Sequence, residues 1–208
     1  MQELRRGLAE SHLFKNTLPD GPTVFFRLIV VRLQVPVSFR ICVSDADERC
    51  DISDPEDLVR FLSEKKAESV FEQNPDAVII AADTVVYLEG EGIMGKPKDD
   101  ADAYRMISKL SGNVNEVYTG VTVRDKDGAE TFAVKTEVHF KKLSDKEIRD
   151  YVASGECSDK AGAYAIQGRA CVFIEKINGD YFNVVGLPLS PLYDILKKKG
   201  VIFWASLT

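Results

Sequence analysis

An aspartate inside an apolar segment is the residue of this chain most able to do chemistry. Asp83 lies in the run 77–88, AVIIAADTVVYL, which is otherwise typical of a buried strand. An ionised carboxylate in such a setting costs free energy unless a cation, hydrogen-bond donors or a proton stabilises it. We therefore expect Asp83 to act as a metal ligand or general base at a strand end, where α/β folds place their sites. The alternative is a structural carboxylate that caps a turn or bonds to Thr84.

Two lysines are candidates for binding a phosphate. Lys66 falls within the apolar stripe of a predicted helix, so its side chain either points into a polar cavity or extends to solvent. Lys65 borders the same stripe, and periodicity does not choose between the two. Lys96 lies between Gly95 and Pro97, which favour an ordered loop that a ligand can approach closely. A plain surface loop is the alternative for this segment.

Two polar segments complete the set of candidates. The loop 158–168, SDKAGAYAIQG, presents Asp159, Lys160 and Gln167 among glycines. A glutamine amide both donates and accepts hydrogen bonds, which suits the edge of a nucleobase. The acidic run 44–48, SDADE, could add a second carboxylate for a divalent cation, or it could be an exposed loop.

These residues must be positioned by alternating helices and strands. The N-terminal signal Ser53-Asp54-Pro55 starts a helix, and Ser144 with Glu147 forms a capping-box pattern. Asn178-Gly179 indicates a hairpin between its flanking apolar segments. The sequence predicts helices over 53–73, 100–110, 144–154 and 190–200, and strands over 28–35, 77–88, 116–124, 131–140, 170–177 and 181–185. This alternation predicts an α/β fold with a mixed twisted sheet and flanking helices.

Composition limits the class of protein. With 208 residues, 45% of them hydrophobic, the chain can bury a core as one domain or as two lobes that share a cleft. A net charge of −6 argues against nucleic acid as a partner, although it allows one bound nucleotide. The four widely spaced cysteines predict buried, reduced thiols in a cytoplasmic protein. The apolar stretch 24–35 is too short, and too interrupted by Arg27 and Arg32, to span a membrane.

In their order and spacing, these motifs resemble the Maf family of nucleotide pyrophosphatases. The resemblance implies two lobes around a central cleft, as in inosine triphosphatase-like folds, and a possible homodimer. It also implies hydrolysis of a nucleoside triphosphate to the monophosphate and pyrophosphate, with Mg²⁺ or Mn²⁺ as cofactor. The matching segments, over about residues 37–200, are SDADE (44–48), EKKAESV (64–70), AADTVV (81–86), GKP (95–97), DAYRMISKLSG (102–112), VYTGV (117–121), LSDKEIRDYVASGE (143–156), DKAGAYAIQG (159–168) and GDYFNVVGLPL (179–189).

The resemblance assigns the chemistry to four of the candidates. Asp83 matches the proton acceptor that activates water. Glu48 and Asp83 would lie near the divalent metal, and Lys66 and Lys96 would hold phosphates.

The remaining candidates, Asp159, Lys160, Thr84 and Gln167, would bind the rest of the substrate. Thr84 and Gln167 match positions that are associated with the choice of base. The forms ADT and IQG resemble the branch that acts on dTTP and UTP, which implies a pyrimidine nucleotide substrate and a role in sanitising the nucleotide pool.

The N-terminus departs from the family pattern. Family members carry a Ser-x-Ser-Pro-Arg-Arg loop after their first strand, whereas here the strand runs directly into 36–48. We therefore divide the chain into an atypical segment, 1–36, and a Maf-like domain, 37–208. Arg32 or Arg40 could replace the missing arginines. Two alternatives remain: a Maf-like protein that binds nucleotide without turning it over, because the phosphate-binding loop is missing, and a generic α/β binding domain.

Overall fold

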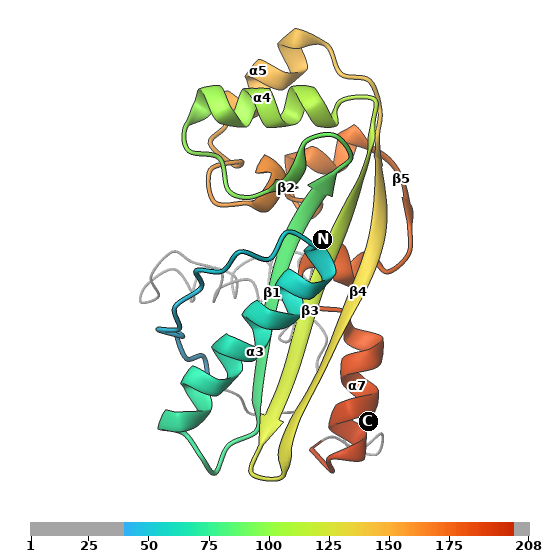
Figure 1. Cartoon of the computed structure of the whole chain (residues 1–208). Coiled ribbons are helices and arrows are strands. Elements are labelled where there is room, and N and C mark those ends of the chain that lie inside the picture. Colours follow the sequence, from blue (N-terminus) through green and yellow to red (C-terminus); the bar gives the residue numbers. More distant parts are fainter. Residues whose placement is uncertain (1–39, 202–208) are drawn as a thin grey trace, which may run out of the picture.

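A computed structural model describes residues 40–201 (Figure 1). Its helices are α3 (Pro55–Gln73), α4 (Asp100–Leu110), α5 (Asp145–Ala153), α6 (Tyr181–Val185) and α7 (Leu189–Lys198), with 3₁₀ turns η2 (Ala161–Ala163) and η3 (Arg169–Phe173). Its strands are β1 (Ile79–Leu88), β2 (Gly92–Met94), β3 (Val114–Asp125), β4 (Gly128–Phe140) and β5 (Ile174–Asn178). The atypical segment 1–36, with the strand expected over 28–35, lies outside the described residues. No helix within 40–201 is long and apolar enough to cross a membrane.

The described strands form one sheet with the order β2-β1-β3-β4-β5, and all of their pairings are antiparallel. The predicted α/β class is confirmed. In the register of β1 and β3, Asp83 lies opposite Gly120 and Thr84 lies opposite Thr119. Because successive residues of a strand point to opposite faces, the side chains of Asp83 and Thr84 project from opposite faces of the sheet. The Asp83 face carries α3, and the Thr84 face carries α6 and α7.

Helix α3 lies unusually close to the sheet. A Cβ atom at Gly120 would lie 2.2 Å from the carbonyl oxygen of Val59, so only glycine allows the helix backbone to rest directly on β3. Val59 is fully buried and packs with Val85 and Tyr118 in a small apolar cluster beneath the helix. This contact fixes how far α3 stands from the strand that carries Asp83.

The predicted helix starts are confirmed. Asp54 caps α3 by accepting hydrogen bonds from the backbone N–H groups of Glu56 and Asp57. At α5, Ser144 and Glu147 form the predicted capping box. Both patterns act within one helical turn, which is why local sequence reveals them.

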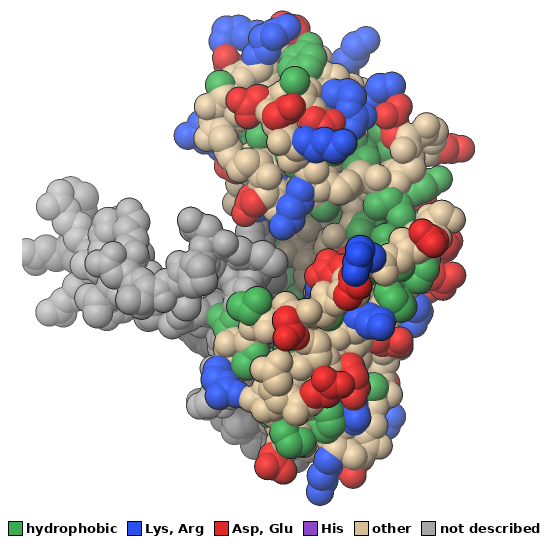
Figure 2. Space-filling model, turned by 60° about the vertical axis from the view of Figure 1, so that its left-hand side comes forward, with side chains coloured by type: hydrophobic (Ala, Val, Ile, Leu, Met, Phe, Trp, Pro, Cys, Tyr) green, Lys and Arg blue, Asp and Glu red, His purple; other side chains and the backbone are tan. Residues whose placement is uncertain are grey.

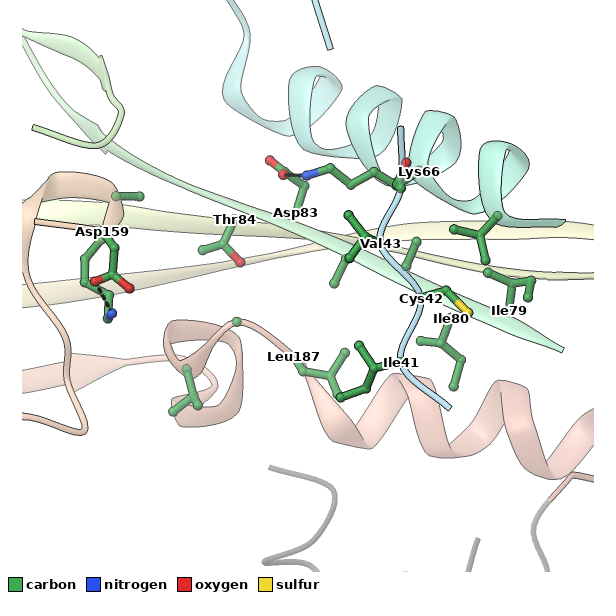
Figure 3. A pocket seen from close by; sticks show the side chains of 18 of the residues that line it. Ile41, Cys42, Val43, Lys66, Ile79, Ile80, Asp83, Thr84, Asp159 and Leu187 are labelled. Carbon is green, nitrogen blue, oxygen red and sulfur yellow. Dashed lines mark hydrogen bonds and ion pairs between the residues drawn. The ribbon is translucent and has the colours of Figure 1, made fainter. Parts of the chain in front are cut away.

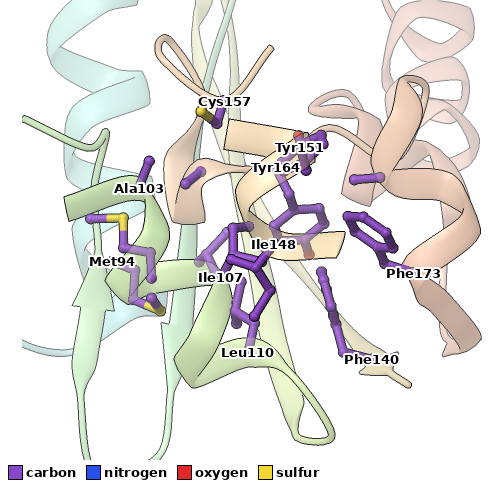
Figure 4. Packing of buried hydrophobic residues seen from close by; sticks show 14 of the residues in the cluster. Met94, Ala103, Ile107, Leu110, Phe140, Ile148, Tyr151, Cys157, Tyr164 and Phe173 are labelled. Carbon is purple, nitrogen blue, oxygen red and sulfur yellow. The ribbon is translucent and has the colours of Figure 1, made fainter. Parts of the chain in front are cut away.

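The buried side chains divide the molecule into two lobes. One large cluster packs beneath α4 and α5 at one end of the sheet, where Phe140 meets Tyr164 and Tyr151 meets Phe173 in edge-to-face contacts (Figure 4). A second cluster packs α7 against β3 at the other end, around Val121. The long strands β1, β3 and β4 connect the two ends (Figure 1).

The hairpin predicted around Asn178-Gly179 is wrong. The first of its strands, β5, begins only at Ile174, and the second is the short helix α6. Asp180 caps that helix by accepting from the N–H of Phe182, and its own N–H donates to Thr136 Oγ1. The chain therefore turns into a helix because tertiary contacts with β4, and not the Asn-Gly dipeptide alone, set its path.

The cysteines also differ from expectation. All four are free thiols, but only Cys157 is buried, whereas Cys42, Cys50 and Cys171 are exposed. The prediction of burial fails for Cys42 and Cys50 because they lie in the irregular segment 40–54, most of whose residues are exposed.

The contact at Gly120 leads to a stability prediction. The variant Gly120→Ala should lower the free energy of unfolding by about 3 kcal/mol, because the added methyl group meets backbone that cannot rotate away. The control is Gly95→Ala, since nothing lies within 4 Å of a Cβ at that position, and it should change stability by about 0.5 kcal/mol or less. Urea denaturation of both variants checks this, and equal midpoints would contradict the proposed close contact.

Candidate functional site

A cavity of about 820 Å³ lies between the two lobes, along the edge of β1 (Figure 3). The surface is visibly hollowed between the part that contains α4 and α5 and the part that contains α3 (Figure 2). The structure brings all eight candidate residues to the wall of this cavity: Glu48, Lys66, Asp83, Thr84, Lys96, Asp159, Lys160 and Gln167.

Asp83 and Lys66 form an ion pair at the centre of the cavity wall (Figure 3). Lys66 projects from α3 and donates a hydrogen bond to Asp83 Oδ1, and its Nζ also lies 3.2 Å from Glu48 Oε1. The side chains of Asp83 and Lys66 are only 15% and 22% exposed. Lys65 is exposed instead, so the structure chooses Lys66 as the lysine that enters the cavity.

The position of Asp83 corrects one expectation. Asp83 lies in the middle of β1 and not at its end, because the strand continues to Leu88 and pairs there with β2. Its carboxylate pairs with a lysine from the overlying helix, and not with Thr84. The cavity reaches this mid-strand position because no described strand pairs with β1 on its outer edge before Val86.

Burial and charge act against each other at this pair. Burial raises the pKa of Asp83 above its ordinary value, although Lys66 opposes the change. Burial lowers the pKa of Lys66, but the carboxylates of Asp83 and Glu48 outweigh it, so the pKa of this lysine is raised. A carboxylate with a raised pKa is a stronger base, and it is held beside a permanent cation.

Lys96 supplies a cation from the opposite lobe. It is exposed, and among the described residues it makes no hydrogen bond or ion pair. Its charge nevertheless lowers the pKa of Asp83, which places the two groups within electrostatic reach. The N–H of Gly162 donates to the carbonyl oxygen of Gly95 over 3.0 Å, so the loop of Lys96 is tied to the loop of residues 159–163.

The loop that carries Gln167 is held by a residue that sequence analysis missed. Both carboxylate oxygens of Glu156 accept from the N–H of Arg169, over 2.8 and 3.0 Å. A Cβ atom at Gly168 would lie 2.1 Å from Glu156 Oε1, so the turn closes tightly over this carboxylate. Gln167 is exposed at the cavity wall. Glu156 ends the family-matching segment 143–156, but nothing in its local sequence indicates this role.

Thr84 is held by a second set of residues that sequence analysis missed. Its Oγ1 lies 2.8 Å from Thr119 Oγ1, and Thr119 donates to the carbonyl oxygen of Asn183 over 3.0 Å. Thr119 and Asn183 are fully buried. Asn183 escapes sequence analysis because its segment is predicted to be a strand.

The donor set fits a divalent cation only in part. Within 40–201 no three His, Cys, Asp or Glu side chains form a metal-binding group. Glu48 and Asp83 both contact Lys66, whereas Asp47 pairs with its neighbour Arg49. Mg²⁺ commonly takes one or two carboxylates and completes its shell with water and substrate phosphates. The two carboxylates therefore suit a cation that arrives with a phosphorylated ligand.

Arg40, which was considered as a replacement for the missing arginines, reaches the cavity. Arg40 lies in the wall and donates a hydrogen bond to Asn74 Oδ1, while Arg32 is outside the described residues.

The Asp159 carboxylate pairs with Lys160, which lies next to it in the same wall. The cavity thus collects several cations around one deeply set carboxylate.

Fold and site define an α/β protein whose interlobe cavity suits a phosphate-bearing ligand and offers a carboxylate that can take up a proton. A family model described as Maf-like protein matches residues 27–199. The chain is 52% identical over 169 residues to the dTTP/UTP pyrophosphatase of Geotalea uraniireducens strain Rf4, which covers 80% of this chain and 87% of that protein. It is 51% identical over 166 residues to the protein of the same name from Alkaliphilus metalliredigens strain QYMF, covering 78% and 85% of the two chains. The chain therefore belongs to the Maf family.

The ion pair leads to a prediction on stability and pH. In metal-free buffer at pH 7, Lys66→Met should lower the free energy of unfolding by about 2 kcal/mol, because Asp83 stays buried without its cation. The loss should shrink as the pH falls. Without Lys66 the pKa of Asp83 in the folded state rises further above its unfolded value, so the folded state takes up the proton first and gains stability on acidification.

Two further variants test this interpretation. The double variant Lys66→Met/Asp83→Asn should recover most of the loss, and Lys65→Met, at the exposed neighbour, should change stability by about 0.5 kcal/mol or less. Urea denaturation over about three pH units, from pH 5 to pH 8, gives the comparison. A loss in Lys66→Met that is independent of pH would show that its cause is packing and not the unpaired carboxylate.

Proposed function

We propose that this chain hydrolyses a nucleoside triphosphate to the monophosphate and pyrophosphate, with dTTP, UTP or modified pyrimidine nucleotides as substrates. The observation that carries the proposal is the buried Asp83–Lys66 pair, which faces Lys96 across a cavity large enough for a nucleotide. The names of the relatives support the same activity. Removal of such nucleotides would sanitise the nucleotide pool.

Each residue has a distinct part in this reaction. Water supplies the oxygen that enters when the link between the α- and β-phosphates breaks, and its proton passes to Asp83. The raised pKa of Asp83 makes it a better acceptor for that proton than an exposed aspartate. Lys66 holds the carboxylate in place, and Lys66 and Lys96 stabilise the charge on the phosphates and on the departing pyrophosphate.

A divalent cation, Mg²⁺ or Mn²⁺, belongs to this proposal. Glu48 and Asp83 would hold it together with phosphate oxygens of the substrate. When bound, the cation neutralises phosphate charge and makes a coordinated water more acidic. Asp159, Lys160, Thr84 and Gln167 would bind the remainder of the nucleotide along the cavity wall.

A second candidate function follows from the N-terminal sequence. The chain lacks the arginine loop of its family, and Arg40 at the cavity is hydrogen-bonded to Asn74. Charge stabilisation at the phosphates would then be weaker, and the protein would bind nucleotide without turning it over.

The test of the main proposal is release of pyrophosphate from a panel of nucleoside triphosphates with Mg²⁺ or Mn²⁺. Asp83→Asn should lower kcat by about 10²-fold or more, because the amide cannot take up the proton. Asp76→Asn, at an exposed aspartate just before β1, is the matched control and should keep wild-type activity. Chelation of the metal should abolish turnover.

The result of this assay decides between the enzyme and a protein that only binds nucleotide. Wild-type activity no greater than that of Asp83→Asn, on every nucleotide, would reject the enzyme. Calorimetric binding of a nucleotide by the same inactive protein would then establish the second function.

A further inference from the structure

A chain of three oxygen atoms leads from the cavity into the core. Thr84 Oγ1 lies at the cavity wall, 2.8 Å from Thr119 Oγ1, which in turn lies 3.0 Å from the carbonyl oxygen of Asn183. Thr84 and Thr119 face each other across β1 and β3, and Asn183 comes from α6. The positions of the hydroxyl protons along this row of oxygen atoms decide whether Thr84 donates a hydrogen bond to a ligand or accepts one.

The inner end of the chain has a fixed polarity. The Asn183 carbonyl oxygen can only accept, and it already takes the N–H of Gly186 over 2.9 Å. Thr119 has one hydroxyl proton. If that proton pointed to Thr84, two lone pairs would face each other over 3.0 Å in a fully buried place. Thr119 therefore donates to Asn183 and must accept from Thr84.

The outer end then has a fixed polarity as well. The single proton of the Thr84 hydroxyl is committed to Thr119, so only its lone pairs remain for a ligand. Gly186 leaves space beside this oxygen, since a Cβ atom there would approach Thr84 Oγ1 to 3.4 Å. Both Thr84 and Gly186 line the cavity.

We propose that Thr119 is a positioning residue which makes Thr84 a hydrogen-bond acceptor toward the cavity, so that the site selects a base with a ring N–H, as in uracil and thymine. Cytosine carries a lone pair and no proton at the corresponding ring nitrogen. Two hydrogen-bond acceptors, this nitrogen and the threonine oxygen, would then face each other. Gln167 cannot make this distinction, because its amide can turn either its donor or its acceptor to the ligand. The inference deepens the proposed function and rests on nucleotide binding in this cavity.

Binding of nucleotides that are not cleaved tests the inference separately from turnover. Calorimetry with Mg²⁺ would compare the α,β-imido analogues of UTP, CTP and 2′-deoxy-UTP. We expect the wild type to bind the uridine analogue about 10-fold or more tightly than the cytidine analogue. Thr119→Val frees the proton of Thr84, so the preference should fall to about 3-fold or less, chiefly through tighter binding of the cytidine analogue.

Two controls separate polarity from packing. Thr119→Ser keeps the hydroxyl and should keep the preference. Thr122→Val removes a hydroxyl that is equally buried on the same strand, bonded to Ser63 and Thr131 and away from the cavity, and should also keep it. A merely structural effect of losing a buried hydroxyl would appear in Thr122→Val too.

Each other outcome overturns the inference. Equal binding of the uridine and cytidine analogues by the wild type would do so, as would binding of neither or a preference that survives in folded Thr119→Val. The wild type could also prefer the UTP analogue to the 2′-deoxy-UTP analogue and lose this preference in Thr119→Val. The group that donates to Thr84 would then be the ribose hydroxyl and not the base. Absence of pyrophosphate release from natural substrates, with the base preference intact, would reject only the proposed reaction.

Discussion

The contact between the backbone of α3 and β3 at Gly120 is the constraint on which the site depends. It sets the helix against the sheet at Val59, and Lys66 follows seven residues later, two helical turns along the same face. Because Asp83 lies opposite Gly120 in the neighbouring strand, the lysine arrives directly over the carboxylate. A helix held further from the sheet would leave Asp83 without its cation, and a buried carboxylate without a cation takes up a proton or destabilises the fold.

Features decided within a few residues were predictable from the sequence. The cap at Asp54, the capping box at Ser144 and the unalternating apolar run of β1 all appear where the residues indicate. The helix α6 after Asn178-Gly179 was not predictable, since the path of this segment depends on Thr136 from another strand. The expectation that Asp83 lies at a strand end was wrong for another reason: no described strand pairs with the outer edge of β1 before Val86, so the cavity reaches a carboxylate in the middle of the strand.

The residues of the candidate site also fall into two groups, those that the sequence reveals and those that it does not. Residues that are chemically out of place in their segment, such as Asp83 and Lys66, attract attention in the sequence, and the family motifs add the others. The supporting residues do not, because their role consists of a bond to a residue distant along the chain. Thr119 meets Asn183 over 64 residues of sequence, and Glu156 closes a turn 13 residues later.

Asp83 and Thr84 are consecutive residues with opposite orientations, and this adjacency makes the site sensitive to a particular kind of genetic change. A single-residue insertion or deletion in β1 before Asp83, if the strand kept its pairing with β3, would exchange the two faces. The carboxylate would then point toward α6 and the hydroxyl toward Lys66. Substitutions elsewhere in the strand preserve this geometry, so length is under tighter constraint here than side-chain identity at the flanking apolar positions.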